Sequence, residues 1–68
     1  MATSFPMLFV DKETDQLFIA ERLDVEFKWF GDAGICGWLY DKDCGWITAS
    51  HNVVTFGRRF EYLDDLRD

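Results

Sequence analysis

The residues best equipped for chemistry in this sequence belong to two copies of Cys-Gly-Trp, at 36–38 and 44–46. Two thiols could form a disulfide or bind a metal, and two tryptophans could form a paired surface on a hairpin. If Gly45 ends the hairpin loop, the numbers of paired residues sum to about 86 to 88, so Cys36 lies opposite residue 50–52 while Cys44 lies in the loop. The two Cα atoms are then more than about 10 Å apart, beyond the roughly 7 Å limit for a disulfide. We therefore expect both cysteines to be free.

A metal site or a catalytic site built on these thiols is also disfavoured. The soft ligands of the chain are Cys36, Cys44 and His51, whereas a structural zinc site takes four ligands at short paired spacings. No motif ties His51 to a nucleophile. We interpret Cys36 as a small buried residue, Cys44 as an exposed loop thiol and His51 as a hydrogen-bonded turn residue.

The acidic segment 11–15 resembles the start of a calcium loop. It departs from that pattern at Gln16, where a calcium loop needs glycine, and at Arg22, where it needs a bidentate glutamate. We interpret this segment, and the shorter Asp41-x-Asp43, as solvated hairpin loops. The chain also lacks a phosphate-binding glycine loop, a nucleophile elbow and a dinucleotide fingerprint. We therefore expect no cofactor and no enzymatic activity.

Size and composition predict a single small globular domain over residues 1–68. Hydrophobic residues make up 49% of the chain and aromatic residues 18%, enough to form a core in a chain this short. Thirteen acidic against seven basic residues give a net charge of −6, which disfavours direct binding to nucleic acid or to an anionic membrane. Without a spanning apolar stretch or a signal-peptide pattern, the chain is expected to be soluble and cytoplasmic.

Apolar runs at 7–10 and 17–20 around a charged loop predict a β-hairpin, with a helix starting at Thr14 as the alternative. Strict alternation of apolar and charged residues over 23–29 predicts a half-buried strand. Residues 31–34 indicate a turn. The first half of the chain is therefore predicted to be mostly β.

The second half continues with the arms of the Cys-Gly-Trp hairpin, at 35–40 and 46–50. Residues 52–56 are typical of another short strand. Helical spacing of apolar residues predicts a helix over 58–68, with an extended conformation of 60–62 as the alternative. The expected fold class is α+β, mostly β: a single antiparallel meander of about five strands, or a partly open SH3-like barrel, with a short C-terminal helix.

The register of the Cys-Gly-Trp hairpin decides what its aromatic rings do. With an even sum, Trp38, Tyr40, Trp46 and Thr48 share one face of the sheet, while Leu39 and Ile47 share the other. With an odd sum, the two tryptophans lie on opposite faces. Both registers are compatible with the sequence, and so is a core made of these rings.

The expected tail helix breaks a local rule of charge placement. Arg58 and Arg59 would lie at its positive N-terminal end, and three aspartates, Asp64, Asp65 and Asp68, at its negative C-terminal end. Local rules are most often broken at functional sites, so these acids could serve a partner. General solubility explains them equally well.

Two classes of function remain, with a third that depends on the register. The first is an acidic binding module, an inhibitor or regulator that docks on a basic surface of a protein partner, such as a surface that holds nucleic acid. Its expected contact residues are Trp38, Tyr40, Asp41, Asp43, Trp46, Glu61, Asp64, Asp65 and Asp68. The second is a self-associating structural subunit, a homo-oligomer. The third is an aromatic cage for a cationic peptide side chain, which needs the even register.

Overall fold

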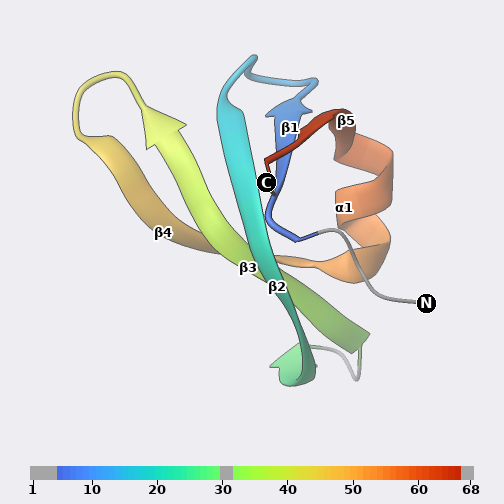
Figure 1. The fold of residues 1–68 in the computed structure, drawn as a ribbon. Helices are drawn as coiled ribbons and strands as arrows, with labels where there is room; N and C mark the ends of the chain where they lie inside the picture. The colour runs from blue at the N-terminus through green and yellow to red at the C-terminus, as the bar shows by residue number, and fades with distance from the viewer. Residues whose placement is uncertain (1–4, 30–31, 67–68) are drawn as a thin grey trace.

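Five antiparallel strands and one short helix form the fold (Figure 1). The computed structural model describes residues 5–29 and 32–66, and the side chains of all of these except 25–29 and 32. In chain order the elements are β1 (Met7–Asp11), β2 (Leu17–Trp29), β3 (Asp32–Asp41), β4 (Gly45–Asn52), α1 (Val53–Arg59) and β5 (Phe60–Asp65). Strands β1 to β4 form a meander, and β5 returns to pair with β1, giving the order β4-β3-β2-β1-β5. The predicted fold class is confirmed, and the sheet is open instead of closing into a barrel.

The first hairpin forms as predicted because Asp11 organises its turn. The Asp11 carbonyl accepts a hydrogen bond from the Asp15 N–H (2.7 Å), and its carboxylate Oδ1 accepts one from the Glu13 N–H (2.9 Å). Asp15 adopts a positive φ of 64°, a conformation that aspartate tolerates better than most residues. These bonds close a turn between two strands, so the alternative of a helix starting at Thr14 is wrong.

Strand β2 is longer than the sequence suggested. It runs for 13 residues, where two separate segments, 17–20 and 23–29, were expected. A register shift between Ala20 and Arg22 marks their junction, so the strand passes through an irregularity instead of ending. Strand β3 already begins at Asp32, so residues 32–34, predicted as part of a turn, belong to a strand. Gly31 lies outside the described residues.

The helix does not lie where the sequence placed it. Segment 52–56, predicted as a strand, contains the start of α1, and segment 58–68, predicted as a helix, contains β5. Asn52 caps the helix, because its Oδ1 accepts hydrogen bonds from the N–H groups of Val54 (2.8 Å) and Thr55 (3.3 Å). This cap outweighs the strand preference of the β-branched residues that follow it. The chain turns extended at Phe60 and pairs with β1, so the alternative reading of 60–62 is correct.

One face of the sheet, here called the inner face, packs against α1 and forms the core. Its residues are Phe9, Phe18, Ala20, Ile35, Leu39 and Ala49. From α1, Phe56 lies edge-on to Phe9, with ring centroids 4.8 Å apart, and stacks on Phe60 at 4.5 Å. Phe18 is 0% exposed. Burial of these rings supplies much of the driving force for a domain of this size.

An ion pair between the buried Asp11 and the half-buried Arg59 joins the end of β1 to the end of α1. Arg59 Nε lies 2.9 Å from both carboxylate oxygens of Asp11, and Nη2 lies 2.7 Å from Oδ2. The Lys12 N–H donates to the Arg59 carbonyl at 2.9 Å in the same region. Together these contacts hold the helix against the sheet. The described helix is not long and apolar enough to cross a membrane.

Candidate protein-docking face

Strands β3 and β4 pair in the even register. Trp38 lies opposite Thr48, and Tyr40 lies opposite Trp46. Because residues directly opposite each other point to the same side of a sheet, these four side chains share one face. Leu39 shares the other face with its partner Ile47. The register that the sequence left open is therefore settled in favour of a common aromatic surface.

The turn of this hairpin explains Asp41 and Gly45. Asp41 Oδ1 accepts hydrogen bonds from the N–H groups of Asp43 (2.7 Å) and Cys44 (3.1 Å). Gly45 ends the turn at a φ of 81°, a backbone conformation that residues with a Cβ atom rarely adopt. The predicted loop and its glycine are confirmed.

The two cysteines are free and differ in their surroundings. Cys36 is buried opposite Ser50, whose hydroxyl donates to Cys36 Sγ at 3.4 Å. Cys44 is exposed in the turn. The prediction of one buried and one exposed thiol is confirmed; Cys36 lies on the same side of the sheet as Trp38 but is buried, and Cys44 lies in the turn.

The sheet face turned away from α1 is here called the outer face. It carries two rows of side chains that run across all five strands, as the strand registers place them. The first row is Asp64, Leu8, Ile19, Trp38 and Thr48, and the second is Glu61, Val10, Leu17, Tyr40 and Trp46. Each row begins with an acid on β5, continues with aliphatic residues on β1 and β2, and reaches an aromatic ring on β3.

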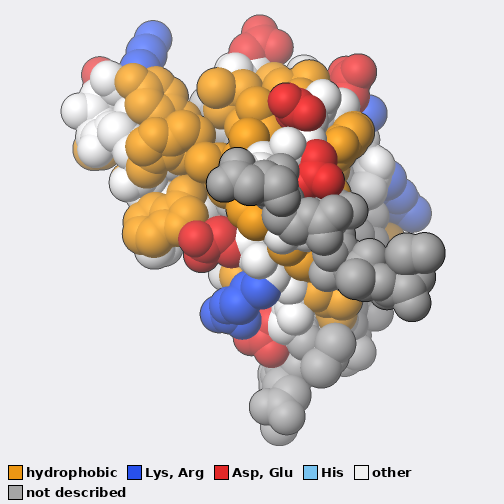
Figure 2. Space-filling model, in the orientation of Figure 1, with side chains coloured by type: hydrophobic (Ala, Val, Ile, Leu, Met, Phe, Trp, Pro, Cys, Tyr) orange, Lys and Arg blue, Asp and Glu red, His pale blue; other side chains and the backbone are white. Residues whose placement is uncertain are grey.

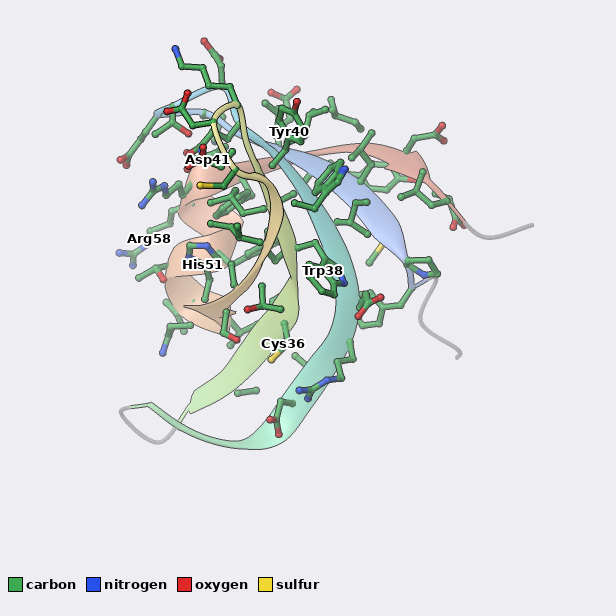
Figure 3. The ribbon with its side chains drawn as sticks, turned by 90° about the vertical axis from the view of Figure 1, so that its left-hand side faces the viewer. Cys36, Trp38, Tyr40, Asp41, His51 and Arg58 are labelled. Atoms are coloured by element: carbon green, nitrogen blue, oxygen red, sulfur yellow. The ribbon has the colours of Figure 1, made fainter. Side chains whose placement is uncertain are left out.

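The aromatic part of the outer face is open. Trp38 is 37% exposed, Tyr40 41% and Trp46 43%. The rings of Tyr40 and Trp46 meet edge-on with centroids 5.2 Å apart. Figure 3 shows Trp38 and Tyr40 pointing to the side of the sheet opposite His51 and α1. The alternative that these rings form the core is therefore wrong.

The outer face combines hydrophobic side chains with carboxylates at its borders. In Figure 2 the hydrophobic side chains extend from the β3–β4 hairpin toward the strands in the centre, with acidic side chains around and between them. Large exposed apolar patches with polar rims mark interaction sites in soluble proteins. No other described element of the chain covers this face (Figure 1).

The acids of the predicted contact set lie at two separate borders. Asp41 and Asp43 lie at the β3–β4 turn, whereas Glu61 and Asp64 lie on β5, with β2 and β1 between β3 and β5. Asp65 pairs with Met7, in the register of the inner face, and Asp68 lies outside the described residues. The predicted helix over 58–68, whose charges would oppose the helix dipole, does not form, because β5 occupies residues 60–65. Arg58 and Arg59 lie in the last turn of α1, where the helix dipole favours cations.

A cleft of about 480 Å³ opens between the β1–β2 and β3–β4 turns. Leu17 and Tyr40 line it beside three carboxylates, those of Asp15, Asp41 and Asp43, with Lys42 as the one cation among its lining residues. The side chain of Gln16 ties the two turns together, because its Nε2 donates to the Tyr40 carbonyl at 3.2 Å. The cleft therefore borders the aromatic end of the outer face.

His51 differs from the turn residue that the sequence suggested. It lies on β4 opposite Ile35, with its ring centroid 4.8 Å from that of Phe60 and 5.6 Å from that of Phe18. Among the described residues, its buried Nε2 has no hydrogen-bond partner. Burial among these rings lowers the pKa of His51, and the nearby Arg59 lowers it further. His51 thus belongs to the core and not to the outer face.

Sequence reasoning found the aromatic residues of the outer face but missed its aliphatic half. Leu8, Val10, Leu17 and Ile19 were assigned only to the first hairpin, although residues two apart in a strand share a face. That alternation was the available signal. It went unused because the segments are apolar on both faces.

Within the described part of the chain, no three or more histidine, cysteine, aspartate or glutamate residues gather where they could hold a metal ion. In comparisons with known proteins, no family model, curated protein or solved structure matches this chain.

Proposed function

We propose that this protein is an acidic binding module that docks its outer face on a basic surface of a partner protein and thereby regulates that partner. One observation carries the proposal. The outer face is an apolar and aromatic surface with acids on β5 and at the β3–β4 turn, with Arg22 on the same side of the sheet opposite Cys36, and no described element of the chain covers its aromatic rings.

The chemistry of the face suits this role. Tryptophan and tyrosine supply most of the binding energy at many interfaces, and Trp38, Tyr40 and Trp46 are all accessible here. The net charge of −6 favours a basic partner and speeds its encounter. A partner that normally holds nucleic acid would present such a basic surface.

Charge also ranks this proposal above self-association. Two copies joined face to face would bring together two acidic surfaces from chains that each carry −6. A basic partner turns the same charges into attraction. The cage alternative needs two rings about one cation, whereas Tyr40 and Trp46 already pack on each other edge-on.

Affinity capture from the cells that make the protein tests the proposal. The tagged chain is used as bait at low and at high salt, beside a Trp38→Ser/Tyr40→Ser double variant. We expect a basic protein that the wild-type bait enriches at low salt, that is released by salt or by added nucleic acid, and that the double variant fails to retain. Equal recovery by both baits would reject the outer face as the docking site.

A further inference from the structure

Strand β4 forms one edge of the sheet, and nothing in its sequence blocks the pairing of a further strand. Its first six residues, Gly-Trp-Ile-Thr-Ala-Ser, contain no charge and no proline. Its register with β3 runs without a bulge from Gly45 to Asn52. Natural edge strands avoid unwanted pairing with charges, prolines and bulges. The first two are missing from 45–50, and the third from all of β4.

The opposite edge carries the devices that β4 lacks. Strand β5 has three acids in six residues, Glu61, Asp64 and Asp65, and its pairing with β1 contains a register shift between Leu8 and Phe9. The two edges of one sheet therefore differ in how strongly they resist a new strand. The acids of the chain protect the β5 edge, whereas residues 45–50 of β4 carry none. The β4 edge is therefore the one that can pair with a further strand.

From this contrast we infer that β4 accepts an extended segment of the partner, which adds as a sixth strand and carries basic side chains at alternate positions. The inference rests on the proposed function and adds to it the conformation of the bound segment. Backbone hydrogen bonds along β4 would supply affinity, and alternate side chains would supply selectivity.

The charges beside β4 favour a basic occupant over a second copy of this chain. Alternate side chains of an added strand would extend the outer face beyond Trp46 and Thr48. At one end of the strand they would meet the turn that carries Asp41 and the exposed Asp43. A lysine there would lie near the exposed Asp43 and an open tryptophan ring, whereas a second copy adds a further net charge of −6.

Two blocked octapeptides of equal charge serve as probes. The first alternates lysine and valine, and the second is the same sequence with every backbone amide nitrogen methylated, so it has no backbone N–H to donate to a ladder. We expect the unmethylated peptide to bind about tenfold more tightly or better, and to slow amide hydrogen exchange within 45–50. Equal affinity for both peptides, or slowed exchange on β5 instead, would overturn the inference.

Two variants of equal charge locate the contact. Ile47→Lys places a charge on β4, and Leu63→Lys places the same charge on β5; the native side chains are 39% and 46% exposed. We expect the first variant to lose about tenfold in affinity for the unmethylated peptide and the second about twofold or less. Equal losses would mean that charge alone attracts the peptide and would contradict a β4 site.

The remaining outcomes separate this inference from the proposed function. If both peptides bind equally and Tyr40→Ser weakens both, the outer face is a docking site but the β4 edge is not. If neither peptide binds at low salt, the inference fails, and the proposed function then depends on the capture experiment alone. If the free chain dimerises and Ile47→Lys abolishes the dimer, the occupant of the edge is a second copy and the inference is wrong.

Discussion

At the scale of single residues, the two ionisable groups in unusual surroundings, Asp11 and His51, affect stability and lie away from the outer face. Asp11 is 1% exposed and its carboxylate is held by Arg59, while His51 lies among the rings of the inner face. Neither faces an open site where a substrate could react. Their environments therefore predict how stability depends on pH.

Replacement of Asp11 by asparagine should destabilise the fold at neutral pH. Hydrogen bonds from Arg59 lower the pKa of Asp11 from 3.8 to about 2. A pKa lowered in the folded state contributes stability above the unfolded value, and that stability is lost as pH falls from about 3.8 through about 2. We expect Asp11→Asn to cost about 2 kcal/mol in urea unfolding at pH 7 and to reduce the acid sensitivity in that window. An unchanged midpoint at pH 7 would contradict this role.

His51 should make the protein less stable in mildly acidic solution. Its pKa is lowered below 6.5 in the fold, so unfolding is accompanied by proton uptake once the pH falls below about 6.5. Stability is complete above that pH and declines below it. We expect His51→Phe, which keeps a ring among Phe18 and Phe60, to remove the decline between about pH 7 and pH 5 in thermal melts. Identical pH profiles for the variant and the wild type would show that His51 does not titrate on unfolding.

At the scale of elements, the repeated Cys-Gly-Trp segments differ in role although their letters are identical. Gly37 lies in β3 where a Cβ would overlap the carbonyl of Ile19 and lie 3.1 Å from the Cα of Ala20. Gly45 has open space around it and needs only its positive φ. The first glycine allows a close approach of two strands, and the second forms a turn.

Alanine at the two positions should therefore have unequal effects. We expect Gly37→Ala to cost about 3 kcal/mol or more, because the clash is with backbone that cannot easily move. Gly45→Ala should cost about 1 to 2 kcal/mol, the strain of a left-handed conformation. Urea unfolding of both variants measures the difference, and a larger loss for Gly45→Ala would reverse the assignment.

The sequence predicted correctly those elements whose local residue pattern favours a single type of secondary structure. Apolar runs on either side of a charged loop predicted the first hairpin, alternation predicted the strand over 23–29, and Gly45 predicted the turn between β3 and β4. The register depended on a one-residue difference that leaves every local preference satisfied, so only the assembled sheet decides where Trp38 and Trp46 point. The helix was misplaced because the Asn52 cap and the pairing of β5 with β1 act against the local propensities of 53–56 and 58–68. The candidate site was therefore predictable as a set of aromatic residues and not as a face.

At the scale of the whole molecule, the exposed apolar residues lie on the outer face of the sheet and acidic residues lie at two of its borders. The inner face holds the core beneath α1, and the outer face presents aromatic rings between acids on β5 and acids in the β3–β4 turn (Figures 1 and 2). Such an arrangement separates two contributions to binding. Carboxylates at the border accelerate association, while desolvated rings slow dissociation.

This separation predicts the kinetics of a matched pair of variants. Asp43→Asn and Val54→Lys each raise the net charge by one, but Asp43 borders the outer face whereas Val54 lies exposed on α1. With the captured partner, we expect Asp43→Asn to slow association more than Val54→Lys and to leave the dissociation rate nearly unchanged. Equal association rates in surface plasmon resonance would show that only the total charge matters.

The central claim is tested most directly by the affinity of the captured partner for the two tyrosine variants, Tyr40→Ser and Tyr62→Ser. Tyr40 is 41% exposed on the outer face, and Tyr62 is 53% exposed on β5, packed beside Phe9 toward α1. Calorimetry at low and at high salt should show a loss of about tenfold or more for Tyr40→Ser and about twofold or less for Tyr62→Ser, with all affinities falling as salt rises. Equal losses for the two tyrosines, or affinities that do not change with salt, would contradict docking through the acidic, aromatic outer face.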